Sequence, residues 1–291
     1  MLGFLIEYHR EGSLRDILAV RRLQGTLALD DQLKWASQVV EALQHIKSKG
    51  PGWYCDLRLD NILLSDKGDV VMIDFEQRGV LPDFASPMDN YLQYVNALVN
   101  DPLLLDPATK KEYRDLYEVH IGPFVPKRRD QHHGCVPWLC MSKSERDASE
   151  MYMLGRLFWC IFESVSSPQK ELWMEYLYEP EYEFPEFRHT PKPLRQLILS
   201  CVPDWIMVDK RIQRKDYQLS VRVSSKGGNQ GRNAFEDMID VWQRELDRAK
   251  GFLRTRGEKS VRTKDENPQD GRLTLDDVLM KLQESVLHGG P

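Results

Sequence analysis

The segment Tyr54-Cys-Asp-Leu-Arg-Leu-Asp-Asn61 is followed by two short apolar runs, residues 62–64 and 70–73. The five residues between these runs, Ser65-Asp-Lys-Gly-Asp69, are typical of a tight turn, so we predict a β-hairpin here. The second run leads directly into Ile73-Asp-Phe-Glu76. Because a hairpin returns the chain to its starting point, we expect the two polar motifs to lie side by side.

Four polar residues of these motifs, Asp56, Arg58, Asn61 and Asp74, are spaced as in the catalytic core of the eukaryotic protein kinase fold, which the segment resembles. Kinases carry an Asp, a basic residue two positions later and an Asn five positions later. A second Asp follows after a short hairpin. Each single match is weak because Asp and Asn are common in turns. Four matches in register make the resemblance specific.

The resemblance implies a role for each of the four residues. Phosphoryl transfer depends on positioning the acceptor hydroxyl and neutralising phosphate charge, with little covalent chemistry for the protein to do. Asp56 is expected to orient the acceptor and take its proton, and Arg58 to contact the transferring phosphate. Asn61 and Asp74 are expected to hold Mg²⁺, which prefers hard oxygen ligands. The implied cofactors are ATP and Mg²⁺.

The start of the chain resembles the fifth strand and the hinge of the same fold. The motif Phe4-Leu-Ile-Glu-Tyr-His-Arg-Glu-Gly-Ser-Leu14 implies Ile6 as gatekeeper. The backbone of Glu7 and His9 is then expected to face an adenine ring, and Leu63 to form the floor beneath it. The Gly-rich loop and the strand lysine of the family belong upstream of this hinge. We therefore expect no N-lobe sheet, and a transferase that is incomplete as given.

Further downstream, residues 151–162 form a dense apolar run with one charge, Arg156, and are expected as a buried central helix. Its start, Glu150-Met-Tyr-Met-Leu-Gly155, resembles the central helix of the kinase fold, with Glu150 in place of an Asp. Residues 74–79 also resemble a fungal family of protein-kinase-like proteins that carries Asp-Phe-Glu-Gln-Arg-Gly. In that family's pattern Asp89 takes the place of a glutamate that anchors the activation segment to a helix-borne arginine.

Apolar periodicity predicts further amphipathic helices. Apolar residues from Leu33 to Ile46 recur at helical spacing, which predicts a helix with Asp30 or Asp31 as its N-cap and Gly50 as its stop. A last helix is expected over residues 273–287, with Thr274 as its cap.

The predicted fold is therefore mainly helical (α+β by class), a kinase C-lobe with a small β-hairpin at the catalytic loop. We expect this lobe to occupy residues 1–255, with a mostly helical insertion at 90–146. A polar linker and a C-terminal amphipathic helix are expected at 256–291.

Composition narrows the functional classes. Forty basic and 45 acidic residues give a net charge of -5, the wrong sign for binding nucleic acid through the overall field. No apolar run approaches the roughly 18–20 residues that span a bilayer. Five scattered cysteines favour reduced thiols in the cytoplasm over a disulfide framework. The expected partner is a protein substrate or a regulatory protein, with no nucleic acid and no membrane.

The favoured function is transfer of the ATP γ-phosphate to a protein hydroxyl, of the Ser/Thr type. One alternative is a catalytically inactive kinase-like module that regulates or binds a partner through the insertion at 90–146. A second alternative is a small-molecule kinase of the aminoglycoside or choline type, in which Ile-Asp-Phe-Glu also occurs. Those enzymes usually carry a histidine two residues before the catalytic Asp, where this chain has Tyr54.

Overall fold

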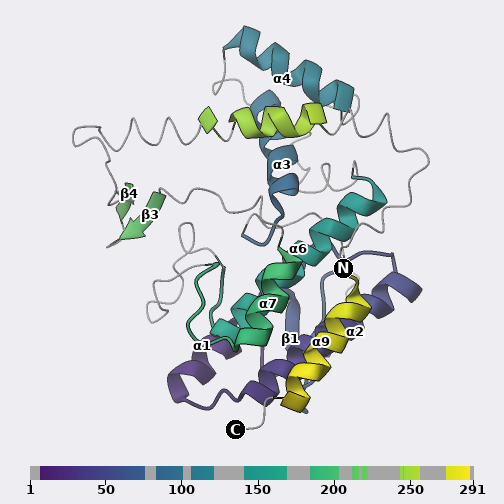
Figure 1. Ribbon diagram of the computed structural model, residues 1–291, viewed down its shortest axis with the longest axis vertical. Helices are drawn as coiled ribbons and strands as arrows, with labels where there is room; N and C mark the ends of the chain where they lie inside the picture. The colour runs from purple at the N-terminus through teal and green to yellow at the C-terminus, as the bar shows by residue number, and fades with distance from the viewer. Residues whose placement is uncertain are drawn as a thin grey trace, which may run out of the picture.

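The computed structural model describes residues 7–75, 83–100, 106–120, 141–168, 184–202, 212–215, 218–221, 243–244, 246–255 and 273–288. Within these residues the protein is mainly helical and carries two small antiparallel sheets (Figure 1). This arrangement confirms the predicted fold class. In the described part of the chain, no helix is both long and apolar enough to cross a membrane.

Two helices follow the N-terminal segment, α1 (Leu14–Gln24) and α2 (Leu29–Lys49). The hydroxyl of Ser13 accepts a hydrogen bond from the backbone N–H of Asp16 and caps α1. α2 buries the apolar stripe that its periodicity predicts. The predicted N-cap of α2 is wrong: the helix begins one residue before Asp30, so both aspartates lie in its first turn, where their charges face the positive end of the helix dipole.

The predicted hairpin is confirmed. Strands β1 (Ile62–Leu64) and β2 (Val70–Met72) pair in antiparallel fashion, with Ile62 opposite Met72. The turn between them needs Gly68, because its φ of 70° lies in the left-handed region. A short 3-10 turn, η1 (Leu59–Asn61), immediately precedes β1.

Helix α6 (Lys143–Glu163) is the central element, and nearly all of its second half is buried. This confirms the predicted central helix. A capping box between Ser142 and Glu145 begins it. Helix α7 (Lys192–Cys201) packs against α6 at Gly155. A Cβ atom at Gly155 would lie 2.8 Å from side-chain atoms of both Cys201 and Val202, so the two helices approach closely here.

Three helical segments gather at one end of the molecule: α3 (Pro87–Asn100), α4 (Pro107–His120) and residues 246–255 (Figure 1). Lys250 forms an ion pair with Glu112 of α4, at 2.8 Å between Nζ and Oε1. The described parts of the predicted insertion are thus helical, as expected. Its residues 101–105 and 121–140 lie outside the described residues, as do Ile6 and the predicted linker.

Helix α9 (Leu275–His288) lies along α2 and buries Leu275, Val278 and Leu282 (Figure 1). Thr274 caps it as predicted, because its hydroxyl accepts a hydrogen bond from the backbone N–H of Asp277. The second sheet was not predicted. Its strands, β3 (Ile212–Lys215) and β4 (Gln218–Val221), are four residues each and contain too few apolar residues to give a strand pattern.

Candidate functional site

The segment Tyr54–Asn61 is here called the polar loop. Two leucines of this loop are buried in the core and hold it in place. Leu57 and Leu59 are fully buried, whereas the residues on either side of each of them are partly exposed or polar. The side-chain amide of Asn61 then closes the loop, donating from Nδ2 to the backbone oxygen of Asp56 at 3.0 Å and to its Oδ2 at 2.8 Å. The loop therefore presents the Asp56 carboxylate from a rigid frame.

The hairpin returns the chain to this frame. The backbone N–H of Ile73 donates to the backbone oxygen of Asn61 at 3.0 Å. Asp74 follows directly and adopts a φ of 59°, in the left-handed region that few residues other than glycine occupy. The predicted metal ligands, Asn61 and Asp74, are thus brought to the same end of the hairpin.

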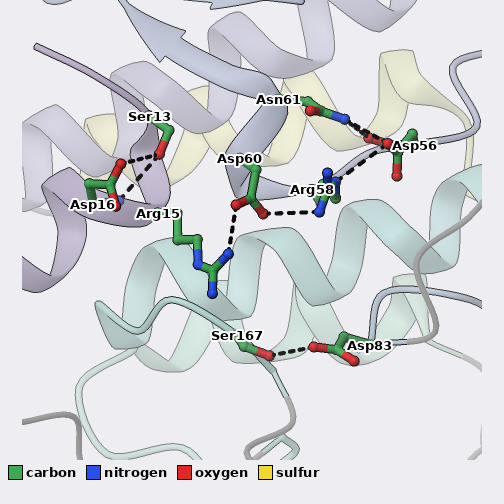
Figure 2. Close-up of polar contacts among 9 residues, drawn as sticks. All are labelled: Ser13, Arg15, Asp16, Asp56, Arg58, Asp60, Asn61, Asp83 and Ser167. Carbon is green, nitrogen blue, oxygen red and sulfur yellow. Dashed lines mark hydrogen bonds and ion pairs between the residues drawn. The ribbon is translucent and has the colours of Figure 1, made fainter. Parts of the chain in front are cut away.

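Arginine side chains flank the polar loop (Figure 2). Nε of Arg58 lies 3.4 Å from Oδ2 of Asp56, and its Nη1 lies 3.4 Å from Oδ2 of Asp60. The other oxygen of Asp60 accepts a hydrogen bond of 2.8 Å from Nη1 of Arg15, on α1. A chain of opposite charges therefore runs from α1 to Asp56.

Burial raises the pKa of Asp56 above its ordinary value, although Arg58 and Asn61 oppose the change and Asp74 adds to it. Both polar neighbours contact Oδ2. Among the described residues none hydrogen-bonds Oδ1, and the side chain is 20% exposed. Asp56 is thus a partly buried carboxylate with one oxygen held by Asn61 and Arg58, while the other oxygen accepts no hydrogen bond from the described residues.

Tyr54 connects the polar loop to two other elements. Its hydroxyl donates to the backbone oxygen of Ile73, and its ring packs edge-on against Phe75 at 5.5 Å between centroids. Its backbone N–H donates to Oε1 of Glu150 on α6, at 3.0 Å. Burial, with contributions from Asp56 and Asp74, raises the pKa of Tyr54, so its hydroxyl stays protonated and keeps donating.

The N-terminal segment that carries two of the predicted adenine-site residues is joined to β1 through Gly12 and Ser13. The backbone N–H of Leu64 donates to the backbone oxygen of Gly12 at 3.1 Å, and Ser13 pairs with Leu63 as an isolated β-bridge. The N-terminal segment carrying Glu7 and His9 is thereby tied to the strand that carries Leu63. Their role toward a nucleotide stays a prediction.

Asp89 has partners other than the implied arginine. Among the described residues its carboxylate accepts hydrogen bonds from the hydroxyls of Ser86 and Ser149 and from the backbone N–H of Ser86. The physical reason is that Ser86 and Asp89 form the capping box of α3, which turns the carboxylate toward α6. Burial raises the pKa of Asp89.

Some residues of this region gave no sequence signal. Arg15 lies 45 positions from its partner Asp60, on a helix whose apolar pattern says nothing about its polar side. Asp83 accepts a hydrogen bond from the hydroxyl of Ser167 at 3.0 Å (Figure 2), across 84 positions. Only Asp60 could have been identified from the sequence, because it lies between Arg58 and Asn61, which were already assigned to the site.

The donor set suits Mg²⁺ bound together with phosphate. Among the described residues no group of three or more His, Cys, Asp or Glu side chains is arranged to hold a metal. Mg²⁺ in nucleotide sites is commonly held by one or two protein oxygens plus substrate phosphates and water. The amide oxygen of Asn61 and the carboxylate of Asp74 fit that pattern.

No protein-family model matches the sequence. A stretch of 114 residues, 38% of this chain, is 30% identical to the serine/threonine-protein kinase shk1/pak1 of Schizosaccharomyces pombe. The chain covers 16% of that protein, so it spans less than a fifth of the relative's length. The similarity indicates a distant kinase-like relationship.

Proposed function

We propose that this chain is the C-lobe of a protein kinase-like phosphotransferase that transfers the ATP γ-phosphate to a serine or threonine hydroxyl. One structural observation carries the proposal. The hydrogen bond from Ile73 to Asn61, together with those from Asn61 to Asp56, gathers the two polar motifs at one end of the hairpin. The similarity to a serine/threonine kinase supports the same hypothesis of a kinase-like function.

Each residue has a task that its surroundings suit. Oδ1 of Asp56 accepts the proton of the acceptor hydroxyl, while Asn61 and Arg58 hold Oδ2. Asn61 and Asp74 hold Mg²⁺, which neutralises phosphate charge when bound. Arg58 places a guanidinium next to Asp56, where the transferred phosphate must pass.

The contact between α6 and the polar loop favours this function over a small-molecule kinase. Glu150 begins the central helix signature, and it hydrogen-bonds the backbone of Tyr54, the residue where small-molecule kinases differ. The same contact is compatible with the inactive regulatory module. Only a measurement of nucleotide binding and transfer separates those two.

The test is Mg²⁺-dependent ATP binding by the full chain, measured by isothermal titration calorimetry with and without Mg²⁺. Asp74→Ala is expected to weaken binding in the presence of Mg²⁺ by tenfold or more, because a carboxylate ligand is lost. Asp66→Ala is the matched control, since Asp66 is an exposed aspartate in the turn of the same hairpin. Its affinity is expected to equal that of the wild type.

The outcomes separate the readings. Equal affinity in Asp74→Ala and wild type would remove the metal assignment. Nucleotide binding without transfer to a generic acceptor protein would favour the inactive module. Transfer to a protein hydroxyl, with none to an aminoglycoside or to choline, is the result the proposal requires.

A further inference from the structure

We propose that Arg15 is a positioning residue, which acts through Asp60 to hold the guanidinium of Arg58 beside Asp56. The inference deepens the proposed function, because it matters for transfer only if Arg58 serves that reaction. The contacts themselves do not depend on that assignment.

Arg15 lies on α1, a helix that is anchored to the core. Its neighbours on α1, Leu14, Ile17 and Leu18, are buried, and Arg22 donates from Nη1 to the backbone oxygen of Ser164 at 2.6 Å. These contacts join α1 to the core and to the end of α6. A side chain on such a helix can hold a loop that is distant in sequence.

The two carboxylate oxygens of Asp60 contact two different arginines (Figure 2). Arg15 takes Oδ1 through a hydrogen bond of 2.8 Å, which directs Oδ2 toward Nη1 of Arg58, 3.4 Å away. The side chains of Arg15, Asp60 and Arg58 are only 20%, 28% and 26% exposed. Solvent therefore screens these pairs less than it screens pairs on an open surface.

Arg58 depends on these contacts for its orientation. Its Nε is shielded from solvent and hydrogen-bonds none of the described residues. What holds its guanidinium is the pair of ion contacts at 3.4 Å, one to Asp56 and one to Asp60. Contacts of that length constrain an arginine only while the carboxylates are themselves fixed. Asn61 fixes Asp56, and Arg15 fixes Asp60.

Charge reversal separates this role from a simple tether between α1 and the polar loop. In the double variant Arg15→Asp with Asp60→Arg, the ion pair between positions 15 and 60 is kept with its charges exchanged. A tether would be restored by that exchange. The proposed positioning would not, because the cation introduced at position 60 repels Arg58.

The readout is the Nε–H signal of Arg58 in ¹H–¹⁵N spectra of the full chain, identified by its loss in Arg58→Lys. Its exchange rate with water reports how firmly the guanidinium is held. Arg15→Met, Asp60→Asn and the charge-reversed double variant are each expected to raise that rate roughly fivefold to tenfold, the net effect of losing one partly solvent-exposed hydrogen bond. Arg15→Lys, which keeps the charge, is expected to recover part of the loss.

Arg21→Met is the matched control. Arg21 lies on the same helix, but its ion contacts of 3.7 Å and 3.6 Å go to Glu11 and Asp31, away from the polar loop. Its removal is expected to leave the Arg58 signal unchanged. Thermal unfolding of every variant shows whether the chain is folded under the conditions used.

Two results would overturn the inference: an unchanged exchange rate in folded Arg15→Met, or full recovery in the charge-reversed variant. If the chain transfers phosphate, Arg15→Met should also lower kcat about tenfold with the KM for ATP unchanged. An Arg58 signal that responds as expected in a chain without transfer activity would retain the positioning role and reject the proposed function.

Discussion

The backbone N–H of Tyr54 donates a hydrogen bond to the carboxylate of Glu150, across 96 positions of sequence. Glu150 is 2% exposed and lies on α6, a helix whose second half is almost entirely buried. The contact therefore joins the polar loop to the core rather than to a flexible surface. It also places an acidic group where ionisation is costly.

Glu150 should make the stability of the protein depend on pH. Burial raises the pKa of Glu150 to about 7, and the hydrogen bond from Tyr54 only partly offsets this. Because the folded state holds its proton more tightly than the unfolded state, the group favours folding at low pH. That contribution is present below the ordinary pKa and is lost as the pH rises through about 7.

The variant Glu150→Gln removes this dependence while keeping an acceptor for Tyr54. Relative to wild type it is expected to gain about 1–3 kcal/mol in the free energy of unfolding at pH 8, and little at pH 4.5. Urea unfolding at both pH values measures the difference. Glu41→Gln, at an exposed position of α2, is the control and should show no such change. A constant difference between wild type and Glu150→Gln at both pH values would contradict the prediction.

Glu163 has the opposite dependence on pH. Although burial acts to raise it, hydrogen bonds from the Thr190 hydroxyl and from the backbone N–H groups of residues 188–190 lower the pKa of Glu163 overall. Its contribution to stability is present above its ordinary pKa and is lost as the pH falls through the lowered value. The carboxylate thus holds the segment before α7 onto the end of α6 at neutral pH.

Replacing Glu163 by Gln leaves an NH₂ group facing backbone donors. We expect a loss of about 2–4 kcal/mol in the free energy of unfolding at pH 7. Hydrogen exchange measured by mass spectrometry should locate the change at residues 188–190. Protection of those amides equal to that of the wild type would show that the carboxylate does not hold them.

Gly155 allows the close approach of α6 and α7. The added Cβ of Gly155→Ala would meet Cys201 and Val202 at 2.8 Å, and one of those atoms belongs to a short side chain that cannot move away. The expected cost is about 1–3 kcal/mol in the free energy of unfolding. Val202→Ala in the same chain should recover part of it by removing one of the two contacts.

Gly251→Ala is the matched control for that substitution. Gly251 is also helical and exposed, and nothing lies within 4 Å of the added Cβ. The change should stabilise the protein by up to about 1 kcal/mol, because alanine is the better helix former. Equal effects at the two glycines would mean that helix propensity, and not packing, decides both.

Patterns local in sequence predicted much of this fold. The turn residues 65–69 predicted the hairpin, and a dense apolar run predicted α6, because each element depends on neighbours a few positions away. The hairpin alone brought Asn61 and Asp74 together. The same reasoning failed at the N-terminus of α2, where either of two adjacent aspartates suits a cap or a first turn.

Contacts between distant residues were beyond such patterns. Arg15 and Asp60 are each ordinary surface residues by sequence, and their pairing exists only because α1 packs beside the polar loop. Asp89 likewise gained a serine partner from α6, Ser149. In both cases the packing of helices decides which polar groups meet, and a single sequence does not encode that packing in a readable spacing.

Asp56 provides the sharpest test of the proposed chemistry. In the proposed function, Asp56→Ala removes the oxygen assigned to receive the acceptor proton but leaves Asn61 and Asp74, the residues proposed to hold Mg²⁺. Nucleotide affinity should therefore change little, while transfer slows by an amount equivalent to about 3–5 kcal/mol, as the base and its positioning are lost together. Calorimetry and a radiolabelled transfer assay measure the two quantities separately, with Asp30→Ala, at an exposed position of α2, as the control. Asp56 is the one described side chain that both Asn61 and Arg58 contact. Transfer that persists in Asp56→Ala would therefore contradict its assignment as the base.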